Sequence, residues 1–259
     1  MWGIIPAAGI GSRIQPLAFS KELLPVGSRL DNGVERPCAV SEYLVERMIH
    51  GGADKICFVI SPGKSDIMEY YGASYGSASI AYVVQPQARG LCDAIFQAAP
   101  LISADESVIV GLPDTVWFPE DALCALPTDM LSFLLFPVRR PELFDSMLME
   151  GDRVREIRVK SDTPASNLIW GAFGMPARVF RELHALWLER DRGDEYVGTL
   201  VNAWLARGNE ARGIAAGTDY VDVGTMHGWR DAMTLLAVSD EPTSFPAARA
   251  AVSTAHRLR

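Results

Sequence analysis

Short runs of apolar residues recur along the first half of the chain and alternate with segments of helical periodicity. Each run is almost continuously apolar, which is typical of a strand buried on both faces of a sheet. The predicted strands span residues 4–8, 56–60, 79–84 and 107–112. The predicted helices between them span residues 40–49, 66–71 and 92–98. This order predicts an α/β fold with a Rossmann-like, mostly parallel sheet that is covered by helices on both faces.

The pattern changes in the second half of the chain. Apolar and polar residues alternate over residues 153–160, as in a half-exposed antiparallel strand. Further strands are predicted at residues 131–136, 167–173 and 218–225, and helices at Pro176, at Asp194 and after Met226. We therefore expect a mixed-strand insertion that completes a site on the parallel sheet. Residues 27–37, which are mostly polar, are predicted to form a loop.

No linker or internal repeat divides the chain. Residues 1–240 are predicted to form a single domain, and residues 241–259 a tail that is helical or disordered. A hydrophobic content of 49% is ample for a large core, and a net charge of −8 argues against broad binding to nucleic acid or to an anionic membrane. The four cysteines lack metal-site spacing, and no apolar run is long enough to span a membrane. We expect a cytoplasmic protein, with a homo-oligomer left open.

A glycine loop directly follows the first strand. Gly9 and Gly11 allow a tight turn in which backbone N–H groups approach a ligand, and Arg13 and Lys21 add two cations. A dinucleotide-binding fingerprint would require a small residue where Ile14 stands, and an ATPase phosphate loop would require Gly-Lys-Ser/Thr. Both motifs fail. The segment still predicts a polyphosphate site, because bare donors and cations meet at a strand end.

Polar residues follow the other strands in the same way. Arg13, Gln85 and Asp114 each stand just beyond a predicted strand, where ligands gather on parallel sheets. Asp222 stands on a late turn that also follows an apolar segment. Two carboxylates together with phosphate oxygens are the usual ligands of Mg²⁺ in proteins. Asp114 and Asp222 are therefore the candidate Mg²⁺ ligands.

Several separated motifs share one family pattern. The opening loop reads G-x-G-x-R with Ser20-Lys21-x-Leu-Leu-Pro, and the later motifs are Gln85-Pro86 with Gly90-Leu91, Leu112-Pro113-Asp114, and Asp222-Val-Gly-Thr225. A weaker match joins Lys160 to the Ser-Asn pair ending at Asn167. In order and spacing, nearly the whole chain resembles the sugar-1-phosphate nucleotidylyltransferases, also called nucleotide-sugar pyrophosphorylases. The resemblance is to the thymidylyl- and uridylyltransferases that act on glucose 1-phosphate.

The resemblance implies a nucleotide-diphospho-sugar transferase fold and a reaction. A nucleoside triphosphate, with dTTP or UTP favoured, would react with a sugar 1-phosphate to give an NDP-sugar and pyrophosphate, with Mg²⁺ as cofactor. It also implies roles: Arg13, Lys21 and Asp114 would be catalytic, Asp114 and Asp222 would bind the metal, and Gln85 would read the base. The substrate-binding residues implied are Ala8, Gly9, Gly11, Gln85, Gly90, Lys160, Asn167 and Gly171.

The chemistry of phosphate agrees with this interpretation. A phosphate monoester has a second pKa of about 6, so the attacking oxygen is already ionised near neutral pH and needs no strong base. The protein must instead align two polyanions and neutralise charge in the transition state. None of the four histidines stands in a nucleophile motif, so none is assigned a role.

Two departures from the family pattern concern the sugar. Val159 stands where an acidic residue is usual, and Phe144-Asp145 stands where Tyr-Gly is frequent. We therefore expect a sugar other than glucose to be preferred. Two alternatives remain: a cytidylyltransferase of the isoprenoid-precursor type, which would lack the late D-x-G-T turn, and a catalytically silent NTP-binding regulatory homologue. The presence together of Arg13, Lys21, Asp114 and Asp222 counts against the second.

Overall fold

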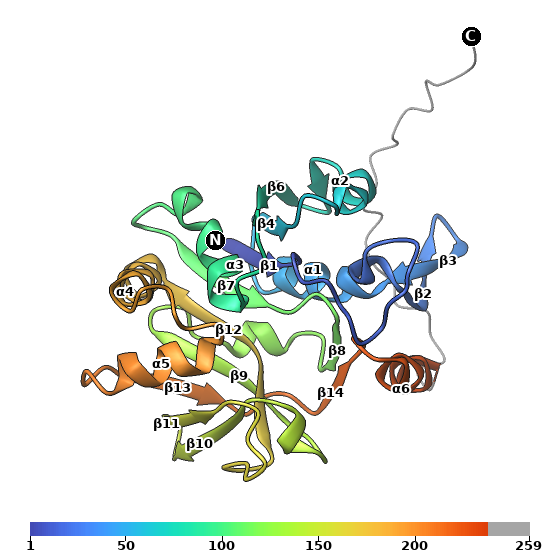
Figure 1. The fold of residues 1–259 in the computed structure, drawn as a ribbon. Helices are drawn as coiled ribbons and strands as arrows, with labels where there is room; N and C mark the ends of the chain where they lie inside the picture. Colours follow the sequence, from blue (N-terminus) through green and yellow to red (C-terminus); the bar gives the residue numbers. More distant parts are fainter. Residues whose placement is uncertain (238–259) are drawn as a thin grey trace.

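One ten-stranded sheet runs through the molecule in the computed structural model, which describes residues 1–237 (Figure 1). In spatial order its strands are β10 (Ser146–Glu150), β11 (Arg153–Arg158), β13 (Ala211–Ile214), β9 (Leu131–Pro137), β12 (Leu168–Pro176), β7 (Ser107–Gly111), β1 (Trp2–Pro6), β4 (Lys55–Ile60), β6 (Ala78–Val84) and β5 (Ser74–Tyr75). The tail predicted beyond residue 240 lies outside the described residues.

The strands β7, β1, β4 and β6 are parallel and form the part of the sheet predicted from the apolar runs. The helices of this half are α1 (Val40–His50), α2 (Ser65–Tyr71) and α3 (Leu91–Gln97). Successive residues of β1 point to opposite faces: Ile4 packs in the cluster that includes α3, and Ile5 in the cluster that includes α1 and α2. The prediction of a sheet covered on both faces is confirmed.

The second half extends the same sheet with mixed strand directions. β12 pairs antiparallel with both β7 and β9, whereas β13 runs parallel to β9. The helices α4 (Ala177–Glu189) and α5 (Val197–Leu205) cover the face that α3 covers. The predicted mixed-strand insertion is thus joined to the parallel strands through β12.

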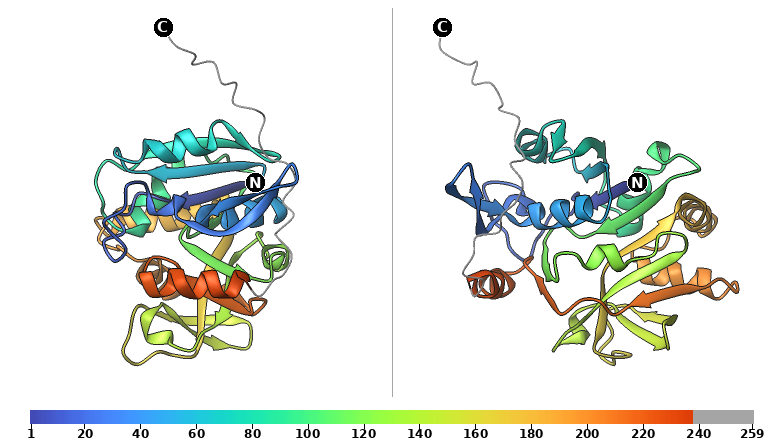
Figure 2. Two further views of the ribbon diagram at one scale, coloured as in Figure 1. Left: turned by 90° about the vertical axis from the view of Figure 1, so that its right-hand side faces the viewer. Right: turned by 180° about the vertical axis from the view of Figure 1, so that it is seen from behind.

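Two small antiparallel pairs lie outside the main sheet. One is the hairpin of β2 (Pro25–Asp31) and β3 (Val34–Ala39), and the other joins β8 (Thr115–Phe118) to β14 (Asp219–Asp222). The last helix, α6 (Met226–Ala237), packs against β2 and β14 (Figure 2). Four short 3-10 turns complete the described residues: η1 (Lys21–Leu23), η2 (Ala99–Leu101), η3 (Ala122–Ala125) and η4 (Pro141–Leu143).

The prediction of a loop at residues 27–37 was wrong, because these residues belong to the β2–β3 hairpin. Most side chains of β3 are exposed, so the hairpin lacks the apolar alternation of a half-buried strand. Its turn holds Asn32 and Gly33 with φ of 51° and 78°, an Asn-Gly pair suited to a two-residue hairpin. That pair was the one local indication of the turn.

Other boundaries differ by a few residues. The strand predicted to reach Lys160 ends at Arg158, and Lys160 itself has a φ of 41°. The helix predicted to begin at Asp194 begins at Val197. The strands β8, β10 and β13 were not predicted. No helix within residues 1–237 is long and apolar enough to cross a membrane.

Candidate active site

The glycine loop is shaped around Lys21. Ala7 and Ala8 are buried where β1 ends, and Gly9 opens onto solvent. Gly11 has a φ of 68°, and a Cβ atom built on it would lie 2.6 Å from the Cδ of Lys21. Gly11 therefore has two reasons to be glycine: the left-handed backbone and the close passage of the lysine stem.

Lys21 forms an ion pair with Asp114, the residue that follows the end of β7 by a short turn. The two side chains are only 15% and 13% exposed. Burial alone would lower the pKa of Lys21, but the carboxylates of Asp114, Glu22 and Asp222 together raise it. Burial likewise opposes ionisation of Asp114, yet Lys21 and Arg13 hold its pKa below the usual value. Both groups are therefore charged at neutral pH.

Asp222 is brought to the same place from the other end of the chain. It pairs with Thr115 in the β14–β8 ladder, and the N–H of Val223 donates to the carbonyl of Asp114 over 2.8 Å. The Nη1 of Arg13 lies 2.9 Å from Asp222 Oδ2. The carboxyl ends of two strands and the glycine loop thus meet, as the sequence predicted.

Gly224 marks the point where these groups converge. A Cβ atom there would lie 2.8 Å from Asp222 Oδ1, 3.0 Å from Arg13 Nη2 and 3.2 Å from Asp114 Oδ2. Two carboxylates that converge in this way fit a hard divalent cation completed by phosphate and water oxygens. Within residues 1–237 no cluster of three or more histidine, cysteine or acidic side chains could hold a metal. A cation bound to these two carboxylates would therefore take its remaining ligands from the substrate or from water.

Gln85 is 3% exposed at the end of β6. Its Nε2 donates to Asp93 Oδ2 over 2.6 Å and to the carbonyl of Gly90 over 3.3 Å. The amide nitrogen is thus engaged within the protein, and the amide oxygen is the atom that Gln85 can present to a base. A Cβ on Gly90 would lie 2.7 Å from Glu195 Cα, so the absence of a side chain at Gly90 lets the backbone of Glu195 pack against it.

Lys160 is exposed, and its Nζ lies 4.8 Å from the centre of the Tyr196 ring. Tyr196 directly follows Glu195, whose carbonyl accepts the N–H of Leu91 at the start of α3 over 2.8 Å. One short segment, residues 195–196, therefore contacts both Lys160 and the start of α3 beside Gly90. This bridge between the predicted base and sugar-phosphate positions had no indication in the sequence.

Asn167 is exposed, and its carbonyl accepts the N–H of Val138 over 2.9 Å. Gly171 lies at a register shift between β12 and β9. A Cβ on Gly171 would lie 2.5 Å from Phe136 and 2.9 Å from Tyr220, so ring packing accounts for this glycine.

Tyr220 lies near both candidate metal ligands and near Asp145. Burial raises the pKa of Tyr220 well above its usual value, and the carboxylates of Asp222, Asp114 and Asp145 raise it further. All three carboxylates therefore lie within electrostatic reach of this phenol. Burial also raises the pKa of Asp145, while Lys160 opposes the shift. Asp145 and Lys160 thus belong to the same region as the two candidate metal ligands.

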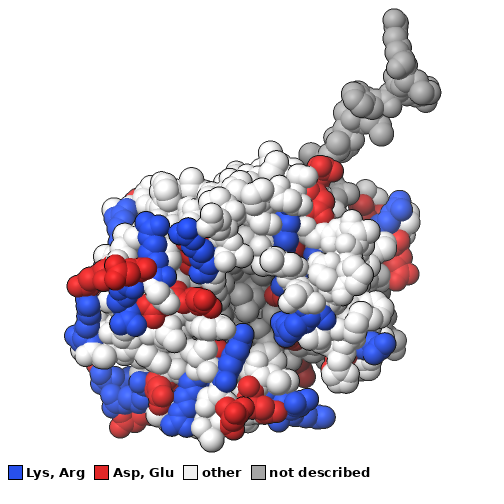
Figure 3. Space-filling view, in the orientation of Figure 1, with Lys and Arg blue, Asp and Glu red and all other residues white. Residues whose placement is uncertain are grey.

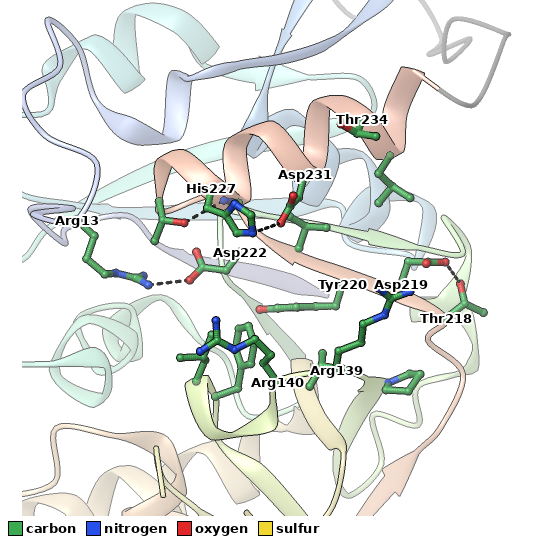
Figure 4. A pocket seen from close by; sticks show the side chains of 18 residues that line it. Arg13, Arg139, Arg140, Thr218, Asp219, Tyr220, Asp222, His227, Asp231 and Thr234 are labelled. Carbon is green, nitrogen blue, oxygen red and sulfur yellow. Dashed lines mark hydrogen bonds and ion pairs between the residues drawn. The ribbon is translucent and has the colours of Figure 1, made fainter. Parts of the chain in front are cut away.

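A cleft of about 1090 Å³ opens beside Arg13 and Asp222 (Figure 4). Arg139 and Arg140 line it from the segment after β9, and His227 lines it from the first turn of α6. Figure 3 shows both basic and acidic side chains around a hollow on one face of the molecule. The same lining holds Asp219, Asp222 and Asp231, so the cleft offers three arginines to an anionic substrate beside an equal number of carboxylates.

The sequence profile of the nucleotidyl transferases matches residues 2–238. The chain belongs to the nucleotidyl transferase family. This confirms the predicted family and class of enzyme. The match spans the glycine loop, Asp114 and Asp222, so the nucleotidyl transferase carries all of its candidate catalytic groups within the shared region.

This nucleotidyl transferase is similar in sequence to two named relatives and in fold to one solved structure. A Bacillus subtilis protein provisionally named UTP–glucose-1-phosphate uridylyltransferase is 28% identical, over 74% of this chain and 80% of its own. A Methanocaldococcus jannaschii protein with the same provisional name is 23% identical, over 87% of this chain and 89% of its own. The UTP-bound UGPase from Acinetobacter baumannii superposes with a TM-score of 0.74 at 20% identity, covering 93% and 94% of the two chains. The predicted fold is confirmed.

Proposed function

We propose that this nucleotidyl transferase joins a nucleoside triphosphate to a sugar 1-phosphate, giving an NDP-sugar and pyrophosphate. The observation that carries the proposal is the quartet of Arg13, Asp222, Asp114 and Lys21, gathered from three parts of the chain around Gly224. Each carboxylate is paired with a cation that could turn instead to phosphate. Such an arrangement suits a reaction between two polyanions.

In this reaction an oxygen of the sugar phosphate attacks the α-phosphorus, and the bond from that phosphorus to pyrophosphate breaks. The attacking group is ionised near neutral pH because its second pKa is about 6, so no side chain has to remove a proton. Lys21 would bind the α-phosphate or the attacking phosphate, and Arg13 would bind the leaving end of the triphosphate. Asp114 and Asp222 would hold Mg²⁺, which neutralises phosphate charge when bound.

The nucleotide we favour is dTTP or UTP. The amide oxygen of Gln85 could accept the N3–H of uracil or thymine, while its amide nitrogen stays bonded to Asp93. The names of the two relatives and of the solved structure refer to UTP, which supports uracil as the base. For the sugar, Lys160 would hold the phosphate and the region around Asp145 would contact the ring.

The test is release of pyrophosphate by the purified protein with a panel of nucleoside triphosphates and sugar 1-phosphates. We expect release with dTTP or UTP and a sugar 1-phosphate, and dependence on Mg²⁺. A clear preference for ATP or GTP would overturn the assignment of the base. Release with CTP and a polyol phosphate alone would favour a cytidylyltransferase, and nucleotide binding without turnover would favour a regulatory homologue.

A further inference from the structure

Lys21 stands between two residues that a single short segment of the chain holds in place. On one side, the N–H and the hydroxyl of Ser20 both donate to Asp66, each over 2.6 Å. On the other side, Lys64 Nζ donates to both carboxylate oxygens of Glu22 over 2.7 Å. Lys64 and Asp66 flank the first residue of α2, which begins at Ser65 after the turn that follows β4.

The Lys64–Glu22 pair is buried deeply. The Glu22 side chain is 0% exposed and that of Lys64 is 10% exposed. Lys64 Nζ also donates to the carbonyl of Ala7 over 2.7 Å, which ties the end of β1 to the Lys21 segment. The hydroxyl of Ser41 on α1 donates to the carbonyl of Glu22 over 2.7 Å. The backbone around Lys21 is therefore anchored to the sheet and to two helices.

Lys64 is also an electrostatic neighbour of the site. Burial lowers its pKa, the Glu22 carboxylate opposes this effect, and the charge of Lys21 lowers it further. A second ammonium behind Lys21 favours an arrangement in which Lys21 points away from it, toward Asp114 and the phosphates.

We propose that Lys64 and Asp66 are positioning residues for Lys21. This inference rests on the role given to Lys21 in the proposed function. A lysine side chain has many rotamers, and its ammonium must stand at one place when the α-phosphorus is attacked. Gly11 confines the stem of Lys21, and the two anchors fix the backbone from which that stem extends. Without the anchors Lys21 could still pair with Asp114, but its ammonium would less often occupy the position that stabilises the transition state.

The alternative is that these contacts only stabilise the fold. A buried ion pair is weak evidence for stability, and removing one partner alone leaves an uncompensated charge. The test therefore uses a neutral double variant, Glu22→Gln with Lys64→Met, and the milder single variant Asp66→Asn. Glu69→Gln, an exposed change on the same helix α2, is the control. Lys21→Met is measured alongside.

The measurements are kcat and KM for the best substrate pair of the panel, together with the thermal midpoint of each variant. We expect Asp66→Asn and the double variant to fold, to lose on the order of 10- to 100-fold in kcat, and to keep both KM values within a few fold. Glu69→Gln should match the wild type. Wild-type kcat in either folded variant would remove that anchor from the mechanism. If Lys21→Met keeps full activity, the role of Lys21 in the proposed function fails; if only the anchor variants are fully active, the positioning inference alone fails.

Discussion

Gly11 and Lys21 are in contact across the glycine loop, so that a Cβ atom on Gly11 would lie 2.6 Å from the lysine Cδ. Glycine in such loops is usually explained by the approach of a phosphate to the backbone. Here the protein itself requires glycine at position 11, because a larger residue would block the side chain of Lys21 on its way to Asp114.

Gly11→Ala should therefore lower kcat by about tenfold or more, because it displaces the stem of Lys21. The control is Gly151→Ala, in the turn between β10 and β11, where φ is also positive at 60° but no atom lies within 4 Å of the added Cβ. Both changes strain the backbone by about 1 kcal/mol. Steady-state kinetics and thermal midpoints separate the two effects. Equal kinetic losses in both variants would contradict the contact argument.

Asp222→Asn should cost on the order of 10²-fold in kcat while keeping the fold, because a charged ligand of the proposed Mg²⁺ is lost. Asp219→Asn is the matched control, since Asp219 stands three residues earlier on β14 and accepts a hydrogen bond from the hydroxyl of Thr218. Turnover is measured over a range of Mg²⁺ concentrations. The concentration giving half-maximal rate should rise only in Asp222→Asn. Near-wild-type turnover in that variant would remove Asp222 from the site.

The Lys21–Asp114 pair predicts how stability depends on pH. The pKa of Asp114 is lowered in the folded protein, so its contribution is present above its unfolded pKa of about 3.9 and is lost as the pH falls through the folded value. The pKa of Lys21 is raised, so its contribution is present below about 10.4 and is lost as the pH rises through the folded value. Between about pH 5 and 9 the pair contributes a constant amount.

Asp114→Asn removes the charge that Lys21 requires and should lower the free energy of unfolding by on the order of 2 kcal/mol in that range. The difference from wild type should be flat from pH 5 to 9 and should shrink in more acidic solution, where Asp114 of the wild type becomes protonated. Urea denaturation at several pH values gives this difference. A gap that widens toward acidic pH would show that Asp114 is not stabilised as an anion.

The parallel strands could be predicted because they are buried on both faces, and a run such as Ile4-Ile5 reveals burial without knowledge of the partner strands. The β2–β3 hairpin could not, since its outward side chains are polar and only Asn32-Gly33 indicated the turn. Arg13, Asp114 and Asp222 could be predicted as site residues because each follows a strand and belongs to a recognisable motif. Lys64 also follows a strand and was overlooked, because its partner Glu22 lies on a distant segment.

The motif glycines show another limit of the sequence. Gly90 and Gly171 were both predicted to bind substrate, yet the space beside each is filled by Glu195 and by two aromatic rings respectively. A pattern identifies where a side chain cannot fit but does not say what occupies the space. For Gly11 the occupant is Lys21, and only the folded chain shows it.

Lys160→Ala should raise the KM for any sugar phosphate by tenfold or so and leave the KM for the nucleotide unchanged, because one charge-assisted contact to phosphate is lost. Arg155→Ala is a suitable control, since Arg155 is an exposed cation of β11 paired with Glu150. Both KM values are determined with the second substrate at saturation. An unchanged KM for the sugar phosphate would contradict the assignment of Lys160.

The final prediction concerns which sugar is accepted. Asp145 stands where glycine is frequent in the family, and Val159 stands where an acidic residue is usual. The Oδ1 of Asp145 and the Nε1 of Trp170 are both buried, and Trp170 opposes the rise that burial causes in the pKa of Asp145. A hydroxyl of glucose that loses its expected carboxylate costs about 1–3 kcal/mol, enough to change preference between sugars by tens of fold.

Glucose 1-phosphate should therefore be a mediocre substrate, and a deoxy, amino or otherwise altered sugar 1-phosphate a better one. Asp145→Gly, which restores the usual small residue, should shift the ratio of kcat/KM values toward glucose 1-phosphate by roughly tenfold, because it removes the carboxylate from the sugar side of the site. Asp162→Asn, an exposed change on the loop after Lys160, should leave the ratio unchanged. If glucose 1-phosphate is the best of a broad panel for the wild type, Asp145 and Val159 do not set the choice of sugar.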